Sequence, residues 1–199
     1  MYFFDAEEKD NNEKENTAKN KSIAEKLFEA RAVFLCGEIN QKIAKETMMM
    51  LTALAADSDD DITIYLNSQG GHVESGDTIH DIIRFVKPRI RIVGTGWVAS
   101  AGTHIYLSVP KDDRLSLPNT RFLIHQPMGG VGGQATDIDI EAKEIVKMRR
   151  RLNEIIARET GQPIEKVSKD TDRNYWMSAE EAIEYGIAGK IINSIDELK

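Results

Sequence analysis

The spacing of hydrophobic and polar residues predicts helices alternating with strands along the first part of the chain. Residues 22–30 have the spacing of a short helix, and the apolar run 33–35 predicts a strand. Asn40 is placed to cap a second helix. The residues that this helix is expected to turn inward are Ile43, Met50, Leu51 and Leu54. The run from Met48 to Met50 is interpreted as core packing.

Two strand-turn-helix units follow. Residues 62–66 form an apolar strand that turns through Gly70 and Gly71 into an amphipathic helix. Residues 90–93 form a second strand, and the turn after it leads into a helix that begins near Ser100. Because strands alternate with helices, the pattern predicts an α/β fold.

The second half contains one unusually long helix. A strand at 122–124 and a glycine-rich stretch precede a helix predicted at 136–160. Its apolar positions keep helical spacing: Ile138, Ala142, Ile145, Met148, Leu152, Ile155 and Ile156. A helix of this length either projects toward a partner subunit or packs across its own domain. A short capped helix at 178–185 and a strand at 190–193 complete the pattern.

Composition limits the class of protein. At 199 residues the chain suits one domain, expected at 22–199, behind an acidic and polar segment at 1–21 that is predicted to be disordered. The net charge of −7 and the lack of a basic run argue against nucleic-acid binding. No apolar stretch approaches the roughly 20 residues of a membrane span, so no membrane association and a cytoplasmic location are expected. Cys36, the only cysteine, is interpreted as core filler.

A candidate nucleophile lies in the turn at 96–102, GWVASAG. A serine at a strand-to-helix turn has an exposed hydroxyl, and the free N–H groups of the helix point at the group it attacks. Small neighbours around Ser100 let a substrate backbone approach closely. The same pattern also fits a serine that only caps a helix, so a catalytic role needs a base.

His125 is the strongest candidate for that base among the four histidines. It follows the apolar strand 122–124 and precedes Pro127, at the end of the strand where α/β folds place side chains that act on ligands. The alternative is a histidine held near the core. The other three histidines are interpreted as structural or surface residues: His72, His80 and His104.

Several segments resemble the proteolytic subunits of ATP-dependent Clp proteases, the ClpP family (peptidase family S14). The run LPNTRFLIHQP at 117–127, followed by GGVGGQATDI at 129–138, resembles the segment around the catalytic histidine of the family. NSQGG at 67–71, the serine turn at 97–102 and MSAEEA at 177–182 resemble three further signatures. The resemblance extends from about residue 24 to 195.

This resemblance implies a fold and a set of roles. The fold is a ClpP/crotonase-like spiral of βα units with a protruding handle helix and strand at about 126–160. Ser100 is expected to be the nucleophile and His125 the base, with the backbone N–H groups of Gly71 and Ala101 as the oxyanion hole. No metal and no cofactor are implied for this subunit, because the ATP is used by a partner unfoldase.

One catalytic position departs from the family pattern. The aspartate of the triad falls at position 174, where this chain has Asn174, as in a ClpP1-like paralogue. An amide can orient the imidazole but carries no charge to stabilise imidazolium, so weakened intrinsic activity is expected. A substitute acid from Asp170 or Asp172 would require the loop to shift.

The resemblance also implies partners. Heptameric rings stacked as a tetradecamer would enclose a chamber in which a serine endopeptidase cleaves unfolded polypeptides delivered by an AAA+ unfoldase. Asp172 and Arg173 match an inter-ring contact pair, and Tyr65 matches a residue of the unfoldase-docking pocket. The alternative function is a regulatory or structural ring subunit that assembles with a more active ClpP paralogue. An acyl-CoA enzyme of the related crotonase fold has no use for a matched Ser100 and His125.

Overall fold

A computed structural model describes residues 21–198, and the expectation of disorder at 1–21 falls outside this part except at Lys21. The predicted α/β character is confirmed. The helices are α1 (Ile23–Glu29), α2 (Gln41–Asp57), α3 (Val73–Phe85), α4 (Ala101–Tyr106), α5 (Ala135–Thr160), α6 (Ile164–Asp170) and α7 (Ala179–Tyr185). The strands are β1 (Ala32–Ile39), β2 (Ile62–Gly71), β3 (Ile90–Ala99), β4 (Arg114–Ser116), β5 (Arg121–Ile124), β6 (Tyr175–Met177) and β7 (Lys190–Ile191). Two 3-10 turns lie at Lys111–Asp113 and Ile195–Leu198.

The sheet divides at β3. Its main path runs β1-β2-β3-β4-β7 with parallel pairing, and β5 also pairs with β3. The first half of β3 pairs with β4 from Ile92 to Gly94, and its last residues, Trp97 to Ala99, pair with β5. β6 then joins β5 in antiparallel fashion. The ends of β3 and β5 therefore lie side by side, and both candidate catalytic residues follow these ends.

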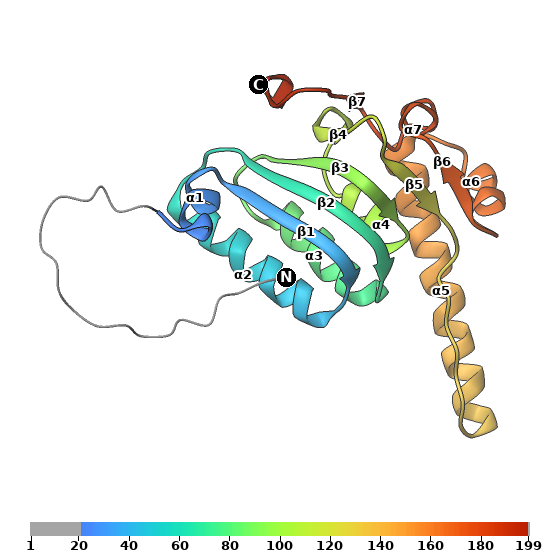
Figure 1. The fold of residues 1–199 in the computed structure, drawn as a ribbon. Coiled ribbons are helices and arrows are strands. Elements are labelled where there is room, and N and C mark those ends of the chain that lie inside the picture. The colour runs from blue at the N-terminus through green and yellow to red at the C-terminus, as the bar shows by residue number, and fades with distance from the viewer. Residues whose placement is uncertain (1–20, 199) are drawn as a thin grey trace, which may run out of the picture.

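Helices α2, α3 and α4 cover one face of the sheet (Figure 1). Along β2 the side chains alternate between buried and more exposed, as in a strand with one buried face. The buried alternate residues join one core with the inner faces of the helices, including Leu35, Leu51, Ile64 and Ile79. The expected inward positions of α2 are largely confirmed: Leu51 and Leu54 are buried, and Ile43 and Met50 pack against the core.

Two expectations about the core are wrong. Cys36 is exposed, because β1 alternates and turns Leu35 inward and Cys36 outward. In the methionine run only Met50 packs against the core, while Met48 and Met49 are 39% and 61% exposed. Three consecutive helical residues point in directions about 100° apart, so they cannot all face one side.

The long helix projects from the body with its first half and packs against its own domain with its second half. In Figure 1, α5 extends away from the sheet, and the connection from β5 runs along it to its first turn. Only Asn153 and Ile156 of α5 are buried, and both lie in its second half. Between Ile124 and Ala135, a stretch that the structure describes in full, the expected handle strand is not formed, since a single chain offers it no strand edge to pair with.

The predicted cap of the last helix is also present. Ser178 accepts a hydrogen bond from the backbone N–H of Glu181, whose side chain accepts one in return from the N–H of Ser178. Among residues 21–198 no helix is long and apolar enough to cross a membrane.

Candidate active site

Ser100 lies between β3 and α4 in a backbone conformation that is unusual for a residue other than glycine, with φ 57° and ψ −119°. Its N–H donates a 2.9 Å hydrogen bond to the carbonyl of Leu123, which ties the junction to β5. On the other side, a Cβ on Gly70 would lie 2.6 Å from the Cβ of Ser100, so only glycine fits there. Strain held by close neighbours is typical of functional positions.

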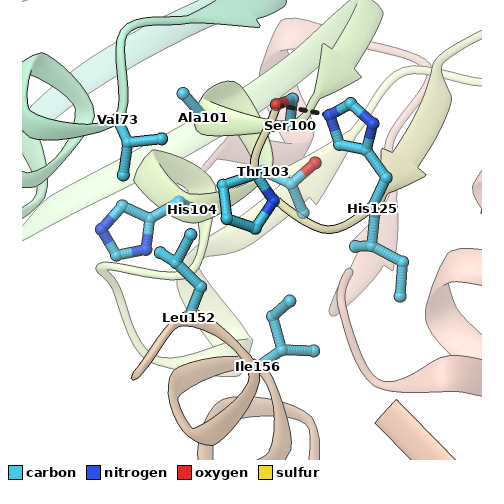
Figure 2. Close-up of a pocket in the computed structure, with 10 residues that line it drawn as sticks. Val73, Ser100, Ala101, Thr103, His104, His125, Leu152 and Ile156 are labelled. Atoms are coloured by element: carbon cyan, nitrogen blue, oxygen red, sulfur yellow. Dashed lines mark hydrogen bonds between the residues drawn. The ribbon is translucent and has the colours of Figure 1, made fainter. Parts of the chain in front are cut away.

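His125 directly follows β5, whose pairing with β3 brings it to Ser100. Its Nε2 accepts a hydrogen bond from Oγ of Ser100 at 2.8 Å, the dashed line in Figure 2. This distance lies within the range over which a base takes a proton from a nucleophile. The two residues that the sequence analysis selected as nucleophile and base therefore meet in the structure.

Asn174 completes the chain of hydrogen bonds. The antiparallel register pairs Ile124 with Tyr175, so the preceding residue, Asn174, comes to lie beside His125. Nδ1–H of His125 donates to Oδ1 of Asn174 at 3.0 Å. With its proton on Nδ1, the imidazole leaves Nε2 free to accept from Ser100, which is the tautomer a general base requires.

Neither nearby aspartate replaces Asn174. The carboxylate of Asp170 accepts hydrogen bonds from Tyr185 at 2.9 Å and from Lys166 at 2.6 Å. Asp172 accepts from Arg149 of α5 at 3.0 Å. Both carboxylates are engaged away from the imidazole, so the third member of the hydrogen-bonded chain is an uncharged amide.

Of the two residues expected to form the oxyanion hole, Ala101 directly follows Ser100, and Gly71 follows Gly70, which packs against Ser100. Ala101 is the first residue of α4, so its N–H has no acceptor within the helix. Gly71 has φ +148°, and a Cβ there would lie 2.2 Å from the carbonyl oxygen of Ile39. A Cβ on Gly70 would lie 3.1 Å from the amide nitrogen of Ala101, so the glycine turn packs directly against the start of α4.

A small cavity of about 30 Å³ opens beside Ser100 and His125. It is called the specificity pocket below, and its other walls include Val73, Thr103, His104, Ile124, Leu152 and Ile156. The hydroxyl of Thr103 lies 2.8 Å from the backbone carbonyls of both Val98 and Leu123, which share its single hydrogen, so its polar atom is occupied away from the pocket. The lining favours a short apolar side chain over a charged one.

A larger open groove of about 710 Å³ lies beyond the pocket. One wall is the turn from Gly71 to Glu74, the second is the stretch 127–132, and the third is the exposed face of α5 near Ile145 and Met148. The groove includes Gly71, whose neighbour Gly70 packs against Ser100, so an extended polypeptide bound in it would run close to the nucleophile.

The remaining predicted site residues take no part in the hydrogen bonds that link Ser100, His125 and Asn174. Arg173 is exposed, next to the Asp172–Arg149 ion pair. Tyr65 lies on the open face of the sheet, stacks on Phe34 with ring centroids 5.0 Å apart, and lines a shallow hollow with Val93. The inter-ring role of Asp172 and Arg173 and the docking role of Tyr65 stay predictions.

Sequence reasoning missed one polar residue near the site. Asp77 of α3 accepts a hydrogen bond from His104 at 2.9 Å and two from Arg151 of α5 at 2.7 Å. Partial burial alone would raise the pKa of Asp77, but these hydrogen bonds outweigh it, and the pKa of Asp77 lies well below its usual range. In residues 21–198 no cluster of three or more His, Cys, Asp or Glu side chains is arranged to hold a metal ion.

Comparisons with known proteins agree with this geometry. A family model described as Clp protease matches residues 13–195. A relative from Rhizobium etli, named ATP-dependent Clp protease proteolytic subunit 3, is 56% identical over 94% of this chain and 96% of its own. Another, from Gluconobacter oxydans and named ATP-dependent Clp protease proteolytic subunit 2, is 60% identical over 98% of this chain and 90% of its own.

Solved structures give the same result. ClpP1 from Listeria monocytogenes matches with a TM-score of 0.82 and 54% identity, covering 89% of this chain and 100% of that chain. An Asn-to-Asp mutant of the same protein matches with a TM-score of 0.84 at the same identity and coverage. By sequence, by fold and by the residues gathered around Ser100, this chain belongs to the Clp protease family, among its proteolytic subunits.

Proposed function

We propose that this chain is a serine endopeptidase subunit that cleaves unfolded polypeptides, with Ser100 as nucleophile and His125 as general base. The observation that carries the proposal is the continuous chain of hydrogen bonds from Ser100 through His125 to Asn174, at 2.8 and 3.0 Å. A histidine with a purely structural role would not need a nucleophile on Nε2 and an orienting acceptor on Nδ1.

The reaction takes place in two halves. In the first, Oγ of Ser100 attacks the peptide carbonyl while Nε2 of His125 takes its proton, and the N–H groups of Gly71 and Ala101 stabilise the oxyanion. Collapse of the tetrahedral intermediate breaks the C–N bond, and His125 gives the proton to the leaving amine. In the second half, water attacks the acyl-enzyme with His125 again as base, which releases the acid product and restores Ser100.

Asn174 is proposed to limit the rate of peptide hydrolysis. Its Oδ1 holds the productive tautomer of His125, but an amide has no negative charge to stabilise the imidazolium that forms in each half-reaction. The proposed subunit is therefore a peptidase with reduced intrinsic turnover rather than an inactive one.

The proposed assembly is a pair of heptameric rings stacked as a tetradecamer in the cytoplasm. The projecting α5 supports this, because most of its surface has no partner within its own described chain. Asp172 and Arg173 are proposed to act in the contact between rings. The ion pair with Arg149 would orient the carboxylate of Asp172 for that contact. An AAA+ unfoldase, which consumes the ATP, is proposed to dock near Tyr65 and deliver substrate.

A second candidate function rests on Asn174 alone. A subunit with an uncharged third residue would serve as a regulatory or structural member of a ring whose other subunits, from a more active paralogue, carry an aspartate there. In that case the geometry around Ser100 is kept while most turnover occurs in the paralogue.

The two functions are separated by one experiment. The purified chain and its Ser100→Ala variant are assayed for hydrolysis of a short fluorogenic peptide, and native mass spectrometry gives particle size on the same samples. Measurable hydrolysis that disappears in Ser100→Ala in an unchanged ring supports the peptidase. Turnover that appears only when an active paralogue is added, and that is equal with Ser100→Ala, supports the regulatory function and rules out the first.

A further inference from the structure

A second series of hydrogen bonds, separate from the triad, joins helices α3, α4 and α5 next to the specificity pocket. Asp77 of α3 accepts a hydrogen bond from Nε2–H of His104 in α4 at 2.9 Å. The same carboxylate accepts two hydrogen bonds from the guanidinium of Arg151 in α5, each at 2.7 Å. A fork of two parallel bonds gives fixed geometry as well as attraction. Asp77 therefore fixes the position of His104 relative to Arg151 in the second half of α5.

The ring of His104 is held by stacking as well as by its hydrogen bond. It is 7% exposed and lies parallel to the ring of His80, with centroids 4.5 Å apart and an interplanar angle of 4°. Nε2 of His80 is buried without a hydrogen-bond partner. Burial, followed by the neighbouring His104, lowers the pKa of His80, which favours its neutral form, and its ring forms a flat surface against that of His104.

This fixed ring forms one wall of the specificity pocket. His104 lines it together with Leu152 and Ile156 of α5, one helical turn after Ser100 (Figure 2). The cavity measures about 30 Å³, and a single water-sized group needs roughly 10–15 Å³ by the same kind of measure. Two or three such groups fill it, which is the size of a short side chain and less than that of leucine or phenylalanine.

We propose that His104 determines the primary specificity of this peptidase. Fixed by Asp77 and by its stacking on His80, it closes the pocket so that the residue supplying the cleaved carbonyl must have a short side chain, such as alanine. Asp77 is a positioning residue in this scheme, because it holds the ring of His104. Arg151, which binds the same carboxylate, links the position of that ring to the position of α5. The inference rests on the proposed peptidase function and adds its substrate class.

The test uses three fluorogenic peptides that differ only in the residue before the cleaved bond, which is Ala, Leu or Phe. The full chain is predicted to give the highest kcat/KM with Ala. The discrimination expected from a single extra methylene group in a pocket is about 10- to 200-fold. His104→Ala is predicted to raise the Leu-to-Ala ratio of kcat/KM at least tenfold. Asp77→Ala is predicted to shift the ratio in the same direction.

Two control variants separate a pocket wall from a general structural role. His104→Gln keeps a donor able to reach Asp77 and is predicted to keep the preference for Ala. Asp81→Ala removes another carboxylate of the same helix, one that touches His80 but not Arg151, and is predicted to leave the ratio unchanged. A purely structural loss would lower turnover of all three peptides together and leave their ratio as it was.

The outcomes distinguish this inference from the function on which it rests. If the kcat/KM of the full chain for the Phe peptide equals that for the Ala peptide, His104 does not limit the size of the pocket. The inference is then overturned, whether or not the His104→Ala variant folds. The same holds if the ratio in His104→Ala is unchanged. If no peptide is cleaved and a fluorophosphonate does not label Ser100, the peptidase function itself fails, and the specificity inference fails with it.

Discussion

Replacing Asn174 with aspartate is predicted to raise peptide turnover, and the structure sets the size of the gain. The new carboxylate would lie where Oδ1 now accepts from Nδ1–H of His125 at 3.0 Å. Two opposite charges about 4 Å apart attract by about 1 kcal/mol in bulk water and about 4 kcal/mol near a protein surface. Because Asn174 is exposed and His125 only partly buried, the gain falls between these limits. It corresponds to an increase in kcat from about fivefold to about 10³-fold.

The assay is steady-state hydrolysis of a short peptide from pH 5 to pH 9, with ring size checked for each variant. Asn174→Asp also stabilises imidazolium in the free enzyme, so the acidic limb of kcat/KM is predicted to move to higher pH. Asn119→Asp adds the same charge in an exposed turn away from the triad and serves as the matched control. An unchanged or lower kcat in Asn174→Asp, in an intact ring whose activity still depends on Ser100, would refute the assigned role of Asn174.

Three further changes test the surroundings of the site. Gly71→Ala is predicted to abolish turnover and lower the unfolding midpoint, because the new Cβ would lie 2.2 Å from the carbonyl oxygen of Ile39. Gly132→Ala is the control, since a Cβ there would have no atom within 4 Å, and equal effects of the two substitutions would contradict the argument. Because the pKa of Asp77 is lowered on folding, its ionised form stabilises the protein above about pH 4 and this contribution is lost as the pH falls further. Asp77→Asn should therefore flatten denaturation midpoints between pH 5 and 3, and a curve parallel to wild type would count against the network. Ser178→Ala should cost about 1 kcal/mol of unfolding free energy through loss of the α7 cap, and an unchanged denaturant midpoint would show that the cap is not needed.

Most long elements could be predicted from the sequence because their patterns are local. The strand beginning at Ile62, the helix from Ala135 to Thr160 and the cap at Ser178 all follow from spacing and capping chemistry. The short strands β4 and β6 and the helix α6 were missed. Each has seven residues or fewer, too few for a period to stand out, and the two strands pair with partners distant in the sequence.

The site was predictable in part. Ser100 and His125 could be selected from their positions at strand ends, while Asn174 required the family pattern, since nothing local marks an asparagine in a loop as the partner of a histidine. The contact of His104 with Asp77 could not be predicted, because it joins two helices 27 positions apart. Cys36 shows the opposite error, since a run of apolar letters was given more weight than strand alternation.

The central claim is that His125 activates Ser100 as a nucleophile, and covalent labelling tests it most directly. The assembled chain is incubated with a fluorophosphonate, and intact and peptide mass spectrometry locate and count the adducts. The account predicts one adduct per chain, on Ser100, that forms much more slowly in His125→Ala and not at all in Ser100→Ala. Labelling of Ser100 at the same rate with and without His125, or no labelling of Ser100 in an intact ring, would contradict it.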